Sequence, residues 1–134
     1  MLRQDSSQPP LKARLRWLPY AFAAGAVFWL IELTRFAAFV LHPAGRDQLY
    51  QPYLKAGLVR DATTLVVVEA AIIIGIEATA AALHATAYYG LRRWRPWGWI
   101  AAVMVASAWS LILIGIPLLV FLLQRETRNA YGIT

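Results

Sequence analysis

Four charged side chains and one histidine lie inside apolar segments of the chain. Glu32 and Arg35 stand three residues apart in WLIELTRFAAF, and Glu69, Glu77 and His84 share the segment VVVEAAIIIGIEATAAALHATAYYG. Residues three apart lie on one face of a helix, so Glu32 and Arg35 can form an ion pair. Carboxylates in such segments are typical of proton or cation pathways, and histidine can ligate a metal or haem. These five residues form the candidate ionisable cluster.

The segment that carries Glu77 has two distinct faces if it is helical. At about 100° per residue, with Glu77 at zero, His84 falls at about −20° and Glu69 at about −80°. These three residues therefore form one ionisable stripe. The opposite face carries small residues, which allow another helix to approach closely. Those residues are Gly75, Thr79, Ala82 and Thr86.

The composition places these residues in a chain whose solvent is largely lipid. Of the 134 residues, 60% are hydrophobic and 15% are charged, and the mean hydropathy is +0.52. A soluble domain of this size needs far more polar surface and typically carries about 25% charged residues. The net charge of +6 comes from bases that flank apolar runs, which favours a lipid bilayer over nucleic acid as the partner. The absence of cysteine excludes disulfides and thiolate metal sites.

Three apolar segments are long enough to span about 30 Å of hydrocarbon. They cover residues 18–41, 62–90 and 96–124, and each must be helical because lipid does not tolerate an unpaired backbone. We therefore expect an all-α, polytopic integral membrane protein with three transmembrane helices.

The remaining segments complete this organisation. A single transmembrane domain, 18–124, is expected between a basic flank, 1–17, and a short tail, 125–134. Apolar residues recur at helical spacing within 42–61, which is compatible with an interfacial helix.

The connection between the second and third segments is a basic turn with aromatic residues. Gly90 is expected to end the second helix, and Trp94, Trp97 and Trp99 to form a belt at the level of the lipid headgroups. Pro117 predicts a kink in the third helix. With three spans the termini lie on opposite sides. Seven bases on the N-terminal side against five on the other favour a cytoplasmic N-terminus.

Function is less constrained than location. The favoured interpretation is a small non-enzymatic membrane subunit that packs through the small residues and the ionisable cluster. It would form a homo-oligomer or an accessory or scaffolding part of a larger complex. The alternative is a proton- or cation-coupled channel or transporter that uses Glu32, Glu69 and Glu77.

Two further classes are weaker. Ala80 and His84 form an A-x-x-x-H pattern that leaves space for a tetrapyrrole, either haem or bacteriochlorophyll, but no cofactor is expected from the pattern alone. Glu69, Glu77 and His84 are spaced by eight and seven residues, unlike the E-x-x-H pairs of carboxylate-bridged metal sites. No nucleophile elbow, phosphate loop or HExxH motif occurs, so neither an enzyme nor a metal site is predicted.

The end of the chain combines RPWGW with GIPLLVFLLQRETRNAYG. This pattern resembles the last helix of small bacterial inner-membrane proteins, in which a basic turn precedes an apolar helix. The resemblance implies a multi-pass protein of the cell's inner membrane, and it implies no activity. The preference for arginine and alanine also suits a bacterial source.

Overall fold

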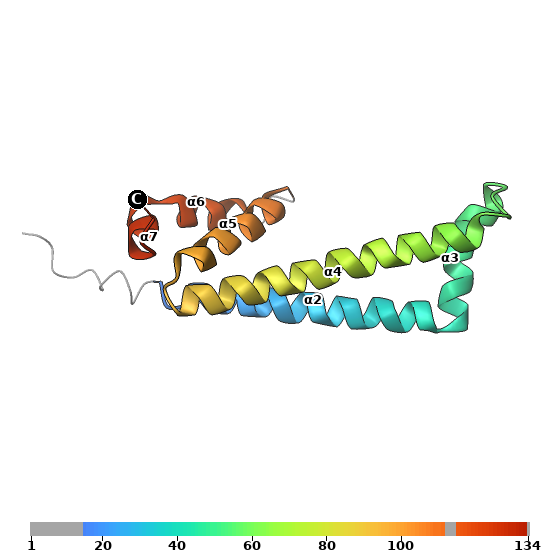
Figure 1. The fold of residues 1–134 in the computed structure, drawn as a ribbon, viewed down its shortest axis with the longest axis horizontal. Helices are drawn as coiled ribbons and strands as arrows, with labels where there is room; N and C mark the ends of the chain where they lie inside the picture. The colour runs from blue at the N-terminus through green and yellow to red at the C-terminus, as the bar shows by residue number, and fades with distance from the viewer. Residues whose placement is uncertain (1–14, 112–114, 134) are drawn as a thin grey trace, which may run out of the picture. The chain divides into compact units, whose positions relative to one another are not determined.

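The computed structural model of the chain describes residues 15–111 and 115–133. Every regular element in these two ranges is an α-helix, which confirms the predicted all-α class (Figure 1). The helices are α2 (Leu18–Leu41), α3 (Pro43–Lys55), α4 (Ala62–Arg92), α5 (Pro96–Ser110), α6 (Ile116–Leu123) and α7 (Arg125–Ala130).

Two of these helices, α2 and α4, are long and apolar enough to cross a membrane. At 1.5 Å per residue they extend about 36 Å and about 46 Å, more than the roughly 30 Å of hydrocarbon. Of the most apolar stretch in each helix, 0% is buried in α2 and 17% in α4, whereas the core helix of a soluble protein is mostly buried. Two of the three predicted spans therefore correspond to candidate membrane-spanning helices, and α4 continues two residues beyond Gly90.

The structure contains two candidate membrane-spanning helices instead of the predicted three, and no described helix extends over the whole of 96–124. The 15 residues of α5 extend only about 22 Å, and α6 has only 8 residues. The chain reverses between these two helices, because the indole Nε1 of Trp99 in α5 donates to the carbonyl oxygen of Leu122 at the end of α6 over 3.0 Å. The segment is thus an antiparallel helical hairpin rather than one kinked helix. Residues 112–114, between the two helices in the chain, lie outside the described residues.

Two residues explain the break in an otherwise apolar run. Pro117 lies in the first turn of α6, where its missing N–H does no harm and where it cannot continue a preceding helix. Gly115 is buried against the backbone of α5, and a side chain there would collide with the carbonyl oxygen of Ala106. The close return of the chain therefore depends on glycine at this position.

The chain divides into two compact units, which we describe separately. Unit 1 combines the chain up to Gly25 with the chain from Leu83 onward, and unit 2 is Ala26–Ala82. The core of unit 1 joins the start of α2, the end of α4, the α5–α6 hairpin and the segment after α7. Its largest fully buried side chains are Leu15, Leu18, Phe22, Leu91, Leu122, Thr127 and Tyr131.

Two glycines let the end of α4 cross the start of α5 at backbone distance in unit 1. A Cβ added to Gly98 would collide with the Cα of Gly90, and a Cβ added to Gly90 would collide with the Cα of Gly98. Gly90 therefore serves close packing and does not end α4. The helix ends at Arg92, and two residues later Trp94 has a φ of 55° while the Arg95 amide donates to the Gly90 carbonyl over 2.9 Å.

Unit 2 contains the later part of α2, the short helix α3 and the first two-thirds of α4. The α3 helix begins directly after His42, whose backbone is extended, and Pro43 occupies its first turn. This confirms a helix within 42–61. Tyr53, near the end of α3, is the residue through which α3 reaches α4, as described below.

Candidate functional site

Unit 2 holds an open cavity of about 730 Å³ with charged residues in its lining. Nη1 of Arg35 donates to Oε1 of Glu32 over 2.8 Å, the pairing that their spacing predicts. Glu77 lines the same cavity, and its Oε2 is shielded from solvent without a hydrogen-bond partner among the described residues. Glu77 is the middle residue of α4. The cavity is therefore lined by two carboxyl groups and one guanidinium. One of the carboxyl groups, that of Glu77, lies at the middle of α4.

Glu69 belongs to a different contact of unit 2. The hydroxyl of Tyr53 in α3 donates to Oε2 of Glu69 over 2.8 Å. This hydrogen bond, with smaller effects of burial and of the carboxylate charge, raises the pKa of Tyr53. Glu69 thus connects α4 to α3 and does not line the cavity that contains Glu77.

His84 lies in unit 1 and is 5% exposed. The indole Nε1 of Trp109 donates to Nε2 of His84 over 3.0 Å, and the two rings meet edge to face at 6.2 Å. Phe22 packs on the other side with its ring 6.3 Å away. Because Nε2 accepts a hydrogen bond, the neutral ring carries its proton on Nδ1.

These contacts do not fit a tetrapyrrole at His84. Nε2 is engaged with Trp109, and the ring packs so closely on α2 that a Cβ on Gly25 would lie 2.7 Å from Nε2. The cavity beside the histidine measures about 200 Å³. Sites for small organic ligands usually measure about 300–1,000 Å³. The space around the His84 ring is therefore occupied by protein, with α2 on one side and α5 on the other.

The five residues of the candidate cluster thus fall into three separate contacts. Glu32, Arg35 and Glu77 line one cavity, Glu69 is bound by Tyr53, and His84 is bound by Trp109. The helical wheel predicted one ionisable stripe from Glu69, Glu77 and His84. It could not identify the partners, because these come from other helices.

The small residues of α4 face outward. Gly75, Thr79, Ala82 and Thr86 are all exposed, and a Cβ added to Gly75 would have no atom within 4 Å. The hydroxyl of Thr79 donates to the Gly75 carbonyl over 2.7 Å, so this surface carries few unsatisfied polar groups. No described part of the chain covers this face at Gly75.

The three tryptophans of the predicted belt have different environments in unit 1. Trp97 is 42% exposed and stacks on Tyr89 with the ring centres 6.1 Å apart. Trp94 stacks on Tyr131 at 5.0 Å. The indole of Trp99 is used to hold the end of α6. Trp97 thus has the exposure that a headgroup contact requires, while the other two are partly buried.

Tyr131 is expected to make the stability of the protein depend on pH. It is 1% exposed, and burial raises its pKa from 10.0 to about 12. The folded protein therefore holds the phenolic proton more tightly than the unfolded chain does between these pH values. We expect the free energy of unfolding to fall as the pH rises from 10 towards 12.

The Tyr131→Phe variant tests this expectation. Thermal unfolding in detergent should show a wild-type stability that declines relative to the variant above pH 10. Below pH 10 the difference between the two proteins should be constant. Parallel curves from pH 8 to 12 would show that Tyr131 does not titrate differently in the folded state.

Three residues of these contacts were not predicted as site residues. Tyr53 lies in 42–61, where the sequence predicts only a helix, and the sequence predicts no role for Trp109 or Gly25 with His84. A weak signal exists for Gly25, since a small residue in an apolar helix often marks a close contact. Nothing in the sequence indicates which aromatic side chain reaches Glu69 or His84.

No family model, curated protein or solved structure matches this chain. The function is therefore inferred from the side chains described above.

Proposed function

We propose that the protein is a small, non-enzymatic integral membrane subunit that assembles with copies of itself or with other membrane subunits. The observation that carries this proposal is the exposure of an ion pair within a candidate membrane span. The side chain of Arg35 is 72% exposed and that of Glu32 is 32% exposed, although both lie within α2.

Lipid is a poor environment for this pair. A charged side chain at the centre of a membrane helix costs about 2.5–3.5 kcal/mol on insertion scales. A neighbouring protein surface can supply hydrogen-bond acceptors that hydrocarbon cannot. Assembly against the Glu32–Arg35 face would therefore remove an unfavourable contact with lipid.

The outward face of α4 supports the same proposal. Small residues let two membrane helices approach closely, which increases van der Waals packing between them. Gly75 and Thr79 are exposed, with their mutual hydrogen bond already formed. This face can pack against a second helix with the Thr79 hydroxyl already hydrogen-bonded.

The Gly75→Leu variant tests the assembly. We expect it to lower the oligomeric state, or to release the partner subunits, in native mass spectrometry from lipid nanodiscs. Ile76→Phe is the matched control, because Ile76 is also exposed but lies on a large-residue face of α4. An unchanged assembly in Gly75→Leu, or equal loss in both variants, would contradict the proposed interface.

The topology follows from two spans and a hairpin that returns to its starting side. The N-terminal flank, the 92–95 turn and the tail then share one side with nine bases, against three in 42–61. This distribution of bases favours a cytoplasmic N-terminus more strongly, and we expect the C-terminus on the same side.

Single cysteines test this topology, since the chain has none of its own. We expect a membrane-impermeant maleimide to label Gln51→Cys in intact cells and to label Asn129→Cys only after permeabilisation. Three spans would place both positions on the same side. Identical labelling of the two variants would therefore contradict the two-span topology.

The cavity of unit 2 supports a second candidate function, proton or cation transport. The specific observation is the shielded Oε2 of Glu77, which has no hydrogen-bond partner among the described residues and lies in a cavity that also contains Glu32. A proton or cation would satisfy such an oxygen. Liposomes containing the protein and a pH-sensitive dye should show flux that Glu77→Gln abolishes and Glu69→Gln retains. No flux, or equal flux in the wild type and both variants, would reject this function.

A further inference from the structure

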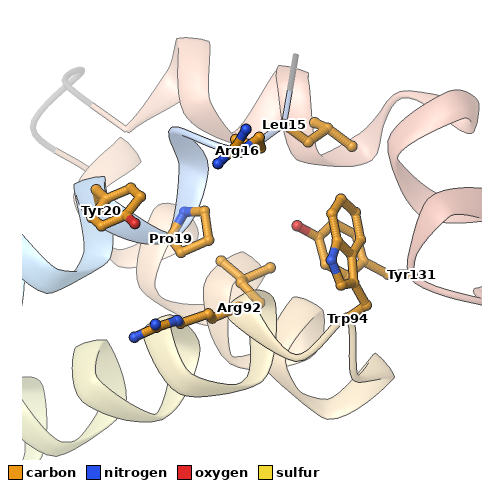
Figure 2. Close-up of a pocket in the computed structure, with 8 residues that line it drawn as sticks. Leu15, Arg16, Pro19, Tyr20, Arg92, Trp94 and Tyr131 are labelled. Carbon is orange, nitrogen blue, oxygen red and sulfur yellow. The ribbon is translucent and has the colours of Figure 1, made fainter. Parts of the chain in front are cut away.

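A second cavity, of about 310 Å³, lies in unit 1 at the end of both candidate spans. Its walls come from the start of α2, the end of α4, the turn after α4 and the segment after α7. Arg16, Tyr20, Arg92, Trp94 and Tyr131 supply its polar and aromatic lining (Figure 2). None of these residues belongs to the cavity that contains Glu77.

The hydroxyl of Tyr131 points into this cavity without a partner. The side chain is 1% exposed, and its oxygen has no hydrogen-bond partner among the residues that the structure describes. Figure 2 shows the oxygen directed towards Arg16 and Pro19. Stacking on Trp94 at 5.0 Å holds the ring in this orientation. A buried hydroxyl normally has a partner, so this one indicates an acceptor that the described residues do not supply.

The arginines make the cavity suitable for an anion. The described part of unit 1 contains six arginines and one acidic residue, Glu126. The ion pair found between described residues joins Glu32 to Arg35, so no described carboxylate neutralises Arg16 or Arg92. Arg92 donates to the Tyr88 hydroxyl over 2.8 Å through Nη1, and its other N–H groups remain available as donors.

The position of the cavity, at the end of both candidate spans, and its apolar lining indicate the source of that anion. Leu15, Pro19 and Leu91 line the cavity beside the arginines, so a ligand with both an anionic head and an apolar attachment suits it. Basic pockets between membrane helices near the interface bind anionic headgroups. Arginine forms charge-assisted and often bidentate hydrogen bonds with phosphate oxygens.

We propose that this cavity binds the phosphate group of an anionic phospholipid. Arg16 and Arg92 supply the positive charge, and the Tyr131 hydroxyl donates to a headgroup oxygen. The apolar walls receive the first part of the lipid's acyl or glycerol region. This site is independent of the proposed assembly, because none of its residues lies on the outward face of α4 or in the cavity with Glu77.

The test uses the full-length, delipidated protein in a neutral detergent. Phosphatidylglycerol should raise the unfolding temperature and should remain bound in native mass spectrometry. Phosphatidylcholine and inorganic phosphate at equal phosphate concentration should do neither. Arg16→Gln and Tyr131→Phe should each weaken phosphatidylglycerol binding by about tenfold or more, as expected for one hydrogen bond to a charged group.

Arg125→Gln is the matched control, because it removes an exposed charge from the same unit without touching the cavity. It should leave the binding unchanged. Circular dichroism should show that all three variants keep the wild-type helix content. Equal stabilisation by inorganic phosphate would overturn the lipid assignment. Phosphatidylglycerol binding that survives unchanged in both cavity variants, or falls equally in Arg125→Gln, would overturn the site.

Discussion

Replacing Gly98 with leucine is expected to separate α5 from the end of α4 and to destabilise unit 1 by about 3 kcal/mol. The backbones of Gly90 and Gly98 are in direct contact, and a Cβ on Gly98 would also lie 2.5 Å from the amide nitrogen of Leu91. Backbone atoms cannot move aside as a flexible side chain can. The helices must separate, and the core between α4 and α5 would open.

Tryptophan fluorescence during unfolding in denaturing detergent measures this effect. Five of the six tryptophans lie in unit 1, so the signal reports mainly on this unit. Gly75→Ala is the control. Because nothing lies near its Cβ, it should equal or exceed the wild type, as alanine favours helix by up to about 1 kcal/mol over glycine. A wild-type unfolding curve for Gly98→Leu would contradict the close crossing.

Replacing Gly25 with alanine is expected to displace the His84 ring and to cost about 2 kcal/mol. The added methyl group would overlap the imidazole, with 2.7 Å to Nε2 as one of the contacts. The ring must rotate away, which breaks the hydrogen bond from Trp109. The cost therefore combines overpacking with the loss of a buried hydrogen bond.

A double-variant cycle separates this specific contact from a general effect of Gly25→Ala. In the His84→Ala background there is no ring to displace, so Gly25→Ala should become nearly neutral, with a coupling energy of about 1–2 kcal/mol. Stability is measured by the same fluorescence experiment. Additive losses in the double variant would show that Gly25 and His84 do not contact each other as described.

Length and apolar composition were sufficient to predict α2 and α4, since each is a continuous run longer than a bilayer requires. The same reasoning failed for 96–124, because hydropathy does not distinguish one long helix from two short ones that pack on each other. Pro117 did mark the point at which the apolar run is interrupted. Whether a proline kinks a helix or permits a reversal depends on tertiary contacts, here the burial of Gly115 on α5 and the hydrogen bond from Trp99.

In the candidate site, likewise, the sequence predicted the contact within one helix but not the contacts between helices. The three-residue spacing of Glu32 and Arg35 predicted their ion pair because both partners are on one helix. The partners of Glu69 and His84 lie 16 and 25 residues away in the chain. A helical wheel contains no information about such distant partners. The exposure of Gly75 likewise required the structure, because the small-residue face could have packed within the chain.

The α5–α6 hairpin has a consequence for how the protein is inserted as it is synthesised. In the proposed topology the hairpin enters the bilayer from the side on which the tail remains, so α7 and its arginines never cross the membrane. Only the segment 42–61 is translocated, and its five charged residues carry a net charge of +1. One helical pair, α2 with α4, therefore accounts for the whole translocation step. The last third of the chain can pack on the start of α2 and the end of α4 after that step is complete.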